Sequence, residues 1–171
     1  LLSTAELRAL VNNDTKTAIR LIDFVGIIPA ITGKVELVYE GEQEGAAKVA
    51  HSLIGEAVKS LFIEFFPKIE KLQKQDDEGP YDDVVSWFFN QKEGFELLDD
   101  FRDKEYKNML DAISPLDDLL AEYQTNLKKE DSYFVKEFVL WALVEYKQLS
   151  KYRFTEGIQF KDPYGSFIND I

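Results

Sequence analysis

"DSYFVKEFVLWALVEYKQLSKYRF", at positions 131–154, carries the strongest helical periodicity of the chain. Apolar side chains cover more than half of the circumference of a helix drawn through it, namely Phe134, Val135, Phe138, Trp141, Ala142, Val144 and Leu149. A helix with so broad an apolar surface is normally buried among other elements. The stretch therefore predicts the central helix of an all-α helical bundle, with Trp141 as an anchor of its core.

Two shorter helices are predicted well before this stretch. "YDDVVSWFFNQ" at 81–91 places Asp82 and Asp83 in a first turn, where carboxylates interact favourably with the helix dipole. Trp87 lies in its apolar run, so we expect it in the core and not in a ligand cage. "DKEYKNMLDAI" at 103–113 has the same period near 3.6 residues and predicts the second helix.

A third helix and a tail flank the central stretch. "SPLDDLLAEYQTNL" at 114–127 predicts a helix with Ser114 as its cap and Pro115 at its first position. The tail at 155–171 keeps aromatic residues but loses periodicity, so we expect it to pack as an irregular strap.

The N-terminal part also has helical periodicity, interrupted by the polar break "NNDT". In "KTAIRLIDFVGIIPAI" at 16–31, Asp23 is positioned to cap a short helix. Pro29 falls inside that helix, where we expect it to remove a hydrogen bond. Gly33 then stops the helix.

A long amphipathic helix is predicted from Gly45 to about Pro67. Its apolar stripe consists of Ala50, Ile54, Ala57, Val58, Leu61 and Phe65. The charged segment 70–81, which ends in Gly and Pro before a tyrosine, is the best linker candidate. The only strand-like piece is "KVELVYE" at 34–40.

Composition limits the classes of function. The chain has 32 acidic and 20 basic residues in 171, a net charge of −12 that repels phosphate backbones and anionic lipid headgroups. We therefore expect neither nucleic acid nor a membrane as a partner. Cysteine is absent, which excludes thiol catalysis and fits a cytoplasmic protein. The longest apolar run, at 138–144, is far shorter than the roughly 20 residues that cross a bilayer.

A phosphate-binding loop is suggested by "IPAITGKV" at 28–35 but is not completed. That loop has a glycine at its first position and a hydroxyl at its last, and it follows a strand. Here Ile28 and Val35 occupy those two positions, and the preceding residues have helical periodicity. Gly33-Lys34 is better interpreted as a helix stop with a basic residue at the negative end of the dipole.

A calcium loop is suggested by "EGEQEG" at 40–45, because Glu40, Glu42 and Glu44 alternate ahead of a glycine. The twelfth position, which should supply a bidentate glutamate, is His51. We therefore predict no metal site, and these three glutamates remain the nearest approach to one. The preferred interpretation is a solvated acidic turn that favours the N-terminus of the following helix.

No catalytic residue is predicted. His51 is the single histidine, and we expect it to have a structural role, partly buried at the rim of the apolar stripe of its helix. The acidic pairs 99–100 and 117–118 each point about 100° apart on a helix, so a solvated face explains them better than acid–base chemistry.

The run "IRLIDFVGIIPAITGKVELVYEGEQEG" at 19–45 resembles the C-terminal helical lid of MoxR-type and magnesium-chelatase-type AAA+ ATPases. The resemblance lies in the entry Asp23-Phe24, the proline segment "IIPAI", the basic region at Lys34 and the element "VYEGEQEG". The family's usual His-Arg pair is absent at Lys34. The opening "LLSTAELRALVNND" resembles the end of that family's sensor-2 helix. The strings "GPYDDVVSWFF", "GFELLDD" and "KEFVLWALVEYKQLSKYRFTEG" are similar to a C-terminal extension of chelatase-like ATPases of the Bacteroidetes type.

This resemblance implies that residues 1–60 are the C-terminal part of an AAA+ lid and that residues 61–171 form a helical extension domain. It implies a larger parent protein that binds ATP and magnesium and that remodels a partner or loads metal into it. The catalytic residues of that parent would precede Leu1, because the chain opens within a helix. This part would be non-catalytic, with no cofactor of its own, and would dock a protein partner or neighbouring AAA+ subunits.

Two other functions stay open at this point. One is a stand-alone helical interaction module without an enzymatic parent. The other is an acidic metal-binding regulatory domain that would use Glu40, Glu42 and Glu44.

Overall fold

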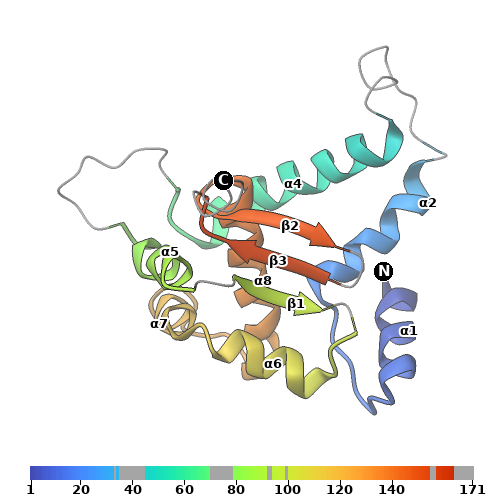
Figure 1. The fold of residues 1–171 in the computed structure, drawn as a ribbon, viewed down its shortest axis with the longest axis horizontal. Coiled ribbons are helices and arrows are strands. Elements are labelled where there is room, and N and C mark those ends of the chain that lie inside the picture. Colours follow the sequence, from blue (N-terminus) through green and yellow to red (C-terminus); the bar gives the residue numbers. More distant parts are fainter. Residues whose placement is uncertain are drawn as a thin grey trace, which may run out of the picture.

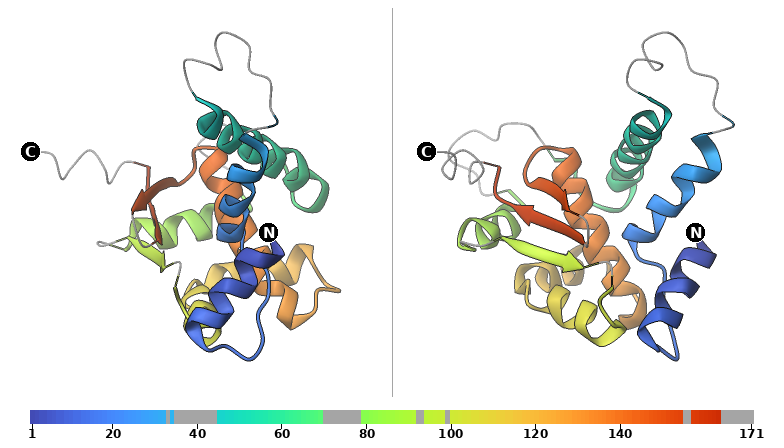
Figure 2. Two further views of the ribbon diagram at one scale, coloured as in Figure 1. Left: turned by 90° about the vertical axis from the view of Figure 1, so that its right-hand side faces the viewer. Right: turned by 45° about the vertical axis from the view of Figure 1, so that its right-hand side comes forward.

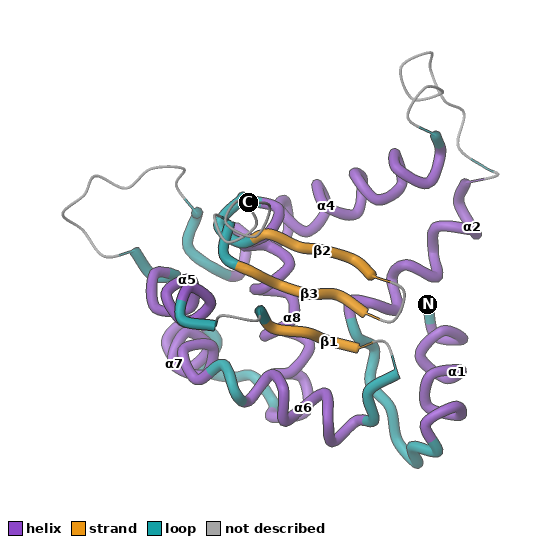
Figure 3. The backbone as a smooth tube through the Cα atoms, viewed as in Figure 1, coloured by secondary structure: helices purple, strands orange, loops and turns teal. Residues whose placement is uncertain are grey.

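Helices account for most of the chain in the computed structural model (Figures 1 and 3). The structure describes residues 1–32, 34, 45–69, 79–91, 94–98, 100–154 and 157–163. The helices are α1 (Leu2–Asn12), the 3-10 helix η1 (Leu21–Ile27), α2 (Ile28–Thr32), α4 (Ala46–Phe65), α5 (Asp82–Phe89), α6 (Asp103–Asp111), α7 (Ser114–Tyr123) and α8 (Lys129–Glu145). The strands are β1 (Phe95–Leu98), β2 (Ser150–Phe154) and β3 (Gly157–Lys161). The predicted helical fold is confirmed, and one small sheet, which was not predicted, is added to it.

Helix α8 lies at the centre of the molecule, with the sheet on one side and α4 packed against it on another (Figures 1 and 2). Its buried residues are Tyr133, Lys136, Glu137, Val139, Leu140, Trp141, Ala142 and Leu143. The predicted central helix and the core position of Trp141 are therefore confirmed. Trp87 is partly buried and packs edge-on against Phe88 and Phe95, so it also belongs to the core.

The central helix ends sooner than predicted. It stops at Glu145, whereas the prediction carried it through the following "YKQLSKYRF". Lys147 adopts the left-handed backbone conformation, with φ 64°. The N–H groups of Lys147 and Gln148 donate to the carbonyl oxygens of Val144 and Leu143 at 2.9 and 2.8 Å. This pair of bonds is a Schellman ending, which usually contains glycine. Because a lysine occupies that position, the sequence lacks the usual stop signal.

The residues after α8 form a hairpin, so the predicted irregular strap is wrong within the described part of the tail. Strands β2 and β3 pair antiparallel, and β3 also pairs with β1, in the order β1-β3-β2. Ile158 and Phe160 are buried and Gln159 between them is only partly buried, which is the period of a strand. Phe160 lies opposite Phe95 in the register. The alternation spans so few residues that it does not stand out in the sequence.

The three short helices predicted before α8 form as α5, α6 and α7. Asp82 and Asp83 lie in the first turn of α5 as predicted, and Pro115 lies in the first turn of α7. The capping role predicted for Ser114 is wrong by one position. Ser114 is already helical, and the fully buried Ile113 occupies the cap position. Packing of Ile113 in the core thus fixes this helix start without a side-chain cap.

The N-terminal segment is helical on both sides of the polar break. Helix α1 ends at Asn12, and the following Asn13 takes the left-handed conformation with φ 56°. The segment predicted as one short helix forms η1 followed directly by α2. Pro29 is the second residue of α2 and lies within the continuous helical run of η1 and α2, as predicted. Gly33 lies outside the described residues.

Helix α4 confirms the long amphipathic helix, which ends just before Pro67. Its apolar stripe is buried only in part: Val58 is in the core, whereas Leu61 and Phe65 are exposed. Most of the linker candidate at 70–81 and of the strand-like piece at 34–40 lies outside the described residues.

One hydrophobic cluster connects η1, α4, α5, α6, α7, α8, β1 and β3 and includes Leu21, Val58, Leu110 and Leu140. The division into 1–60 and 61–171 stays a prediction. Within the described residues, no helix has the length and apolar content needed to cross a bilayer.

Candidate functional site

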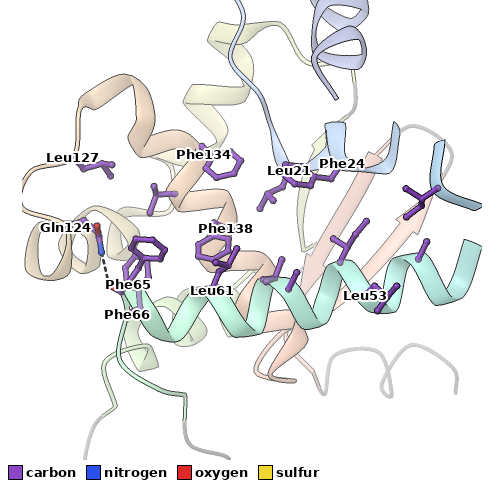
Figure 4. Close-up of a pocket in the computed structure, with 16 residues that line it drawn as sticks. Leu21, Phe24, Leu53, Leu61, Phe65, Phe66, Gln124, Leu127, Phe134 and Phe138 are labelled. Carbon is purple, nitrogen blue, oxygen red and sulfur yellow. Dashed lines mark hydrogen bonds between the residues drawn. The ribbon is translucent and has the colours of Figure 1, made fainter. Parts of the chain in front are cut away.

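An open apolar groove runs along α4 (Figure 4). Its volume is about 520 Å³. Helix α4 forms one side, and η1, the N-terminal half of α8 and the loop before α8 form the other. Among the described lining residues, Gln124 is the only one with a polar side chain. Its Nε2 donates to the carbonyl oxygen of Phe65 at 2.7 Å, so this amide closes one end of the groove.

The α4 side of the groove is a continuous apolar ridge. It consists of Leu53, Ala57, Leu61 and Phe65, all exposed and spaced four residues apart. Residues at this interval form one of the two kinds of ridge with which helices pack. The next ridge faces the groove floor and the core and consists of Ala50, Ile54, Val58 and Phe62. One ridge of α4 thus packs against the rest of the molecule, and a second ridge with the same helix-packing spacing is exposed to solvent.

The opposite side of the groove is aromatic. Phe24 of η1 and Phe134 of α8 lie with ring centroids 6.5 Å apart. Phe138, one turn further along α8, contacts the ring of Phe62 at 5.8 Å and connects the two sides at the floor. Figure 4 shows these rings facing the side chains of α4 across the groove. Their positions depend on how η1 is held against α8.

A buried carboxylate holds η1 against α8. Oε2 of Glu137 accepts hydrogen bonds from the backbone N–H of Leu21 at 2.9 Å and from the hydroxyl of Tyr106 at 2.7 Å. The guanidinium of Arg20 lies 4.1 Å from the centroid of the Tyr106 ring and donates to the carbonyl oxygen of Phe101 at 2.8 Å. All three side chains are buried. The groove side contributed by Leu21 is therefore fixed by a polar cluster behind it.

The ionisation of this cluster is shifted by its burial. Desolvation raises the pKa of Glu137 above its ordinary value, although the hydrogen bonds from Tyr106 and Leu21 oppose the shift. Burial, followed by the nearby positive charge of Arg8, lowers the pKa of Arg20. Burial and the carboxylate of Glu137 raise the pKa of the Tyr106 hydroxyl. These groups face one another behind the groove and do not line it.

Arg8 and Asp23 attach α1 to the same cluster. Nε and Nη2 of Arg8 donate to the two carboxylate oxygens of Asp23 at 3.2 and 2.8 Å, and both side chains are buried. Asp23 also accepts from the backbone N–H of Arg20 at 2.8 Å. Asp23 is the third residue of η1, so the predicted N-cap position is wrong. Its carboxylate reaches back to the residue before the helix, as the third helical residue of a capping box does.

The predicted metal candidates do not form a described site. Glu40, Glu42 and Glu44 lie outside the described residues. His51 is exposed on α4, so its predicted partial burial is wrong. In the parts of the chain that the structure describes, no group of three or more potential metal-ligating side chains comes together. The segment before Gly33 is helical, as the argument against a phosphate loop expects.

The paired acids have separate surroundings. Asp99 lies outside the described residues, and Asp100 is exposed. Asp117 is exposed, as predicted, and its Oδ1 also lies 2.9 Å from the buried Nζ of Lys136. Asp118 is exposed, as predicted.

The groove and the buried charges were not predicted as sites. The four-residue spacing of Ala57, Leu61 and Phe65 was visible in the predicted stripe of α4, which did not include Leu53. No sequence pattern shows that the ridge stays uncovered. Lys136 and Glu137 interrupt the apolar face of α8, and this interruption was the available signal for the polar cluster.

The groove offers apolar surface and no reactive group. Among its described lining residues there is no acid, base or nucleophile placed for catalysis. Its side chains can bind an apolar face, such as that of an amphipathic helix. Comparisons of the chain with models of known protein families, with curated proteins and with solved structures give no match.

Proposed function

We propose that this chain is a protein-docking module that holds an amphipathic helix in the groove along α4. The exposed ridge of Leu53, Ala57, Leu61 and Phe65 beside an apolar groove carries the proposal. Contiguous exposed apolar surface of this kind commonly marks an interaction site. Its linear shape and its helix-packing spacing favour a helix as the bound element.

The parent protein is part of this proposal. The resemblance of residues 19–45 to an AAA+ lid supports a non-catalytic C-terminal part of a cytoplasmic chelatase-like or MoxR-like ATPase. In that case ATP and magnesium act in the parent, upstream of this chain. Isothermal titration of the chain with MgATP should show no tight binding, and tight binding would contradict an upstream nucleotide site.

Peptide binding tests the docking function. The probe is a fluorescein-labelled synthetic helix with leucines at i, i+3, i+4 and i+7, measured by fluorescence anisotropy at about 0.15 M salt, which screens the charge of the chain. We expect the wild-type chain to bind it. Leu61→Asp should weaken binding at least tenfold, because a carboxylate would be desolvated in the groove.

The matched control is Ile63→Asp. Leu61 and Ile63 lie on the same helix and are 49% and 53% exposed, but only Leu61 lines the groove. Both substitutions add one negative charge, so an electrostatic effect would be equal for both. If the wild type does not bind the peptide, or if both variants lose binding equally, the groove is not the docking site.

A further inference from the structure

Building on the proposed docking function, we propose that the helix received by the groove is α1 of a second copy of this chain. Copies would then associate head to tail, with α1 of one copy seated along α4 of the next. The proposal rests on an exposed apolar helix face and an open apolar groove that lie on different sides of the same molecule.

Helix α1 has its largest apolar side chains on the outside. Those exposed are Leu2, Leu7, Leu10 and Val11, at 69%, 62%, 75% and 68%. Those buried against the chain are Ala5, Arg8 and Ala9. An amphipathic surface helix normally has the reverse arrangement. Leu7, Leu10 and Val11 lie within about 100° of one another around the helix, so this part of the outer face of α1 is suited to burial in another surface.

This face does not turn inward within its own copy. Arg8 is held on the inner face by its two bonds to Asp23. Nδ2 of Asn12 donates to the carbonyl oxygen of Phe101 at 3.3 Å, which holds the C-terminal end of α1. Figures 1 and 2 place α1 beside η1 and apart from α4 in every view. In the proposed contact, α1 therefore enters the groove of another copy and not its own.

The shape of α1 fits the groove. Leu7, Leu10 and Val11 have the i, i+3, i+4 spacing of the anchors by which helices bind in grooves. At 1.5 Å per residue, α1 is about 17 Å long, and the part of α4 from Ala50 to Phe65 is about 24 Å long. A whole α1 can thus lie beside the exposed ridge of α4.

Area and charge set the expected strength of this contact. Leu7, Leu10 and Val11 together offer on the order of 200 Å² of apolar surface. Even with the groove surface that would cover them, the total lies below that of standard stable interfaces. We therefore expect weak association, detectable at about 0.1–1 mM protein.

Charge favours one orientation of α1. Glu6 is exposed between the apolar residues of α1, and Lys128 and Lys129 are exposed beside Leu127 at one end of the groove. The N-terminus of α8 adds a partial positive charge at that end. Glu130 and Asp131 follow within the same turn and reduce the net attraction, so charge contributes to orientation more than to affinity.

Two variants of this chain and their mixture test the proposal. Sedimentation equilibrium should show concentration-dependent association of the wild type and of the control Ile63→Asp. Leu10→Asp removes the donor face and Leu61→Asp removes the acceptor groove, so each variant alone should be monomeric. An equimolar mixture should form a one-to-one dimer and nothing larger, because one intact groove and one intact α1 remain. This complementation is specific to a contact between two different surfaces.

Other outcomes separate this proposal from the docking function. If the peptide binds the groove but the wild-type chain stays monomeric at about 0.1–1 mM, the docking function stands and the second-copy proposal is overturned. If Leu61→Asp prevents association while Leu10→Asp does not, the grooves pair with each other and α1 is not the bound element. If the mixture stays monomeric although the wild type associates, a head-to-tail contact is also overturned.

Discussion

Helices α8 and α4 are both long and rich in apolar residues, but they meet opposite environments. In α8, even two charged side chains, Lys136 and Glu137, are almost completely buried. In α4, apolar side chains as large as Leu61 and Phe65 are about half exposed. The two helices pack against each other, so the difference arises on the sides that they turn away from their contact.

The difference shows that burial depends on what surrounds a helix. The sheet, α4, α6, α7 and η1 surround α8 (Figure 1). Carboxylates of α6 and α7 pair with Lys136, and the Tyr106 hydroxyl of α6 and the Leu21 backbone N–H of η1 donate to Glu137. Among the described residues, α4 packs against α8 and α2, while its outer ridge stays exposed. The buried charges of α8 are stabilised by groups of the same chain. The exposed apolar surface of α4 would, in our proposal, be covered by another molecule.

The largest expected difference in stability is between two phenylalanines of α4, one on its buried inner ridge and one on its exposed outer ridge. Phe62 is fully buried and contacts four aromatic rings, whereas Phe65, three residues later, is 54% exposed. Phe62→Ala should lower the free energy of unfolding by about 3–5 kcal/mol. Phe65→Ala should lower it by less than about 1 kcal/mol. Urea unfolding measures both, and similar losses would show that the outer ridge is part of the core.

Removing the carboxylate of Glu137 should have the next largest effect. Glu137→Ala leaves the buried N–H of Leu21 and the hydroxyl of Tyr106 without their acceptor. We expect a loss of about 3 kcal/mol in the free energy of unfolding. The groove should also be affected, because Leu21 forms part of its opposite side. A loss below about 1 kcal/mol would mean that other contacts hold η1 against α8.

The raised pKa of Glu137 predicts that the difference in stability between the wild type and Glu137→Gln depends on pH. A carboxyl group whose pKa is higher in the folded state binds its proton more tightly there. Its favourable contribution is fully present below the unfolded pKa, near 4.5, and is lost as pH rises toward the folded pKa. The wild-type free energy of unfolding minus that of Glu137→Gln should therefore decrease as pH increases from about 4. A difference that increases over this range would show that the hydrogen bonds dominate over desolvation.

The helices were largely predictable because each carries a local signal. The period of 3.6 residues identified α4, α5, α6, α7 and α8, and Pro67 marked the end of α4. The end of α8 was missed because Lys147 occupies a left-handed position that usually holds glycine. The sheet was missed because its order depends on pairing β1 with β3, which lie far apart in the chain. Such pairing leaves no local trace beyond a few alternating residues.

The groove was predictable only in its composition. The stripe of α4 contained the ridge residues Leu61 and Phe65, but the stripe alone does not separate a buried side chain from an exposed one. That distinction depends on η1 and α8, whose relative positions are fixed by Glu137 and Leu21. The polar cluster in turn joins Arg8, Arg20 and Glu137, which no spacing rule connects.

Lys136 should tolerate substitution better than its neighbour Glu137, although both are buried. Its Nζ lies 2.6 Å from Asp111 and 2.9 Å from Asp117, and the side chains of these acids are 48% and 60% exposed. In Lys136→Met the two carboxylates can be hydrated, and the methionine keeps most of the packing of the lysine stem. We expect a loss of about 1 kcal/mol or less by urea unfolding. If Lys136→Met loses as much stability as Glu137→Ala, the exposure of Asp111 and Asp117 does not determine how much the loss of Lys136 destabilises the protein.

The smallest expected effect concerns the contact between α4 and α8 itself. A Cβ at the buried Gly55 would lie 2.5 Å from Oε2 of Glu145, the end of a flexible side chain that can rotate away. Its 3.9 Å ion pair with Lys151 contributes little, whereas alanine is favoured over glycine within a helix by about 1 kcal/mol. Gly55→Ala should therefore leave the free energy of unfolding unchanged or raise it by up to about 1 kcal/mol.

The control is Gly157→Ala. Its Cβ would lie 2.5 Å from the backbone oxygen of Leu97, so this substitution should lower the free energy of unfolding by about 1–3 kcal/mol. Equal losses of stability in the two variants would show that the contact between α4 and α8 at Gly55 has no more room for a methyl group than the paired strands have at Gly157. Only the outer ridge of α4 would then be available for binding.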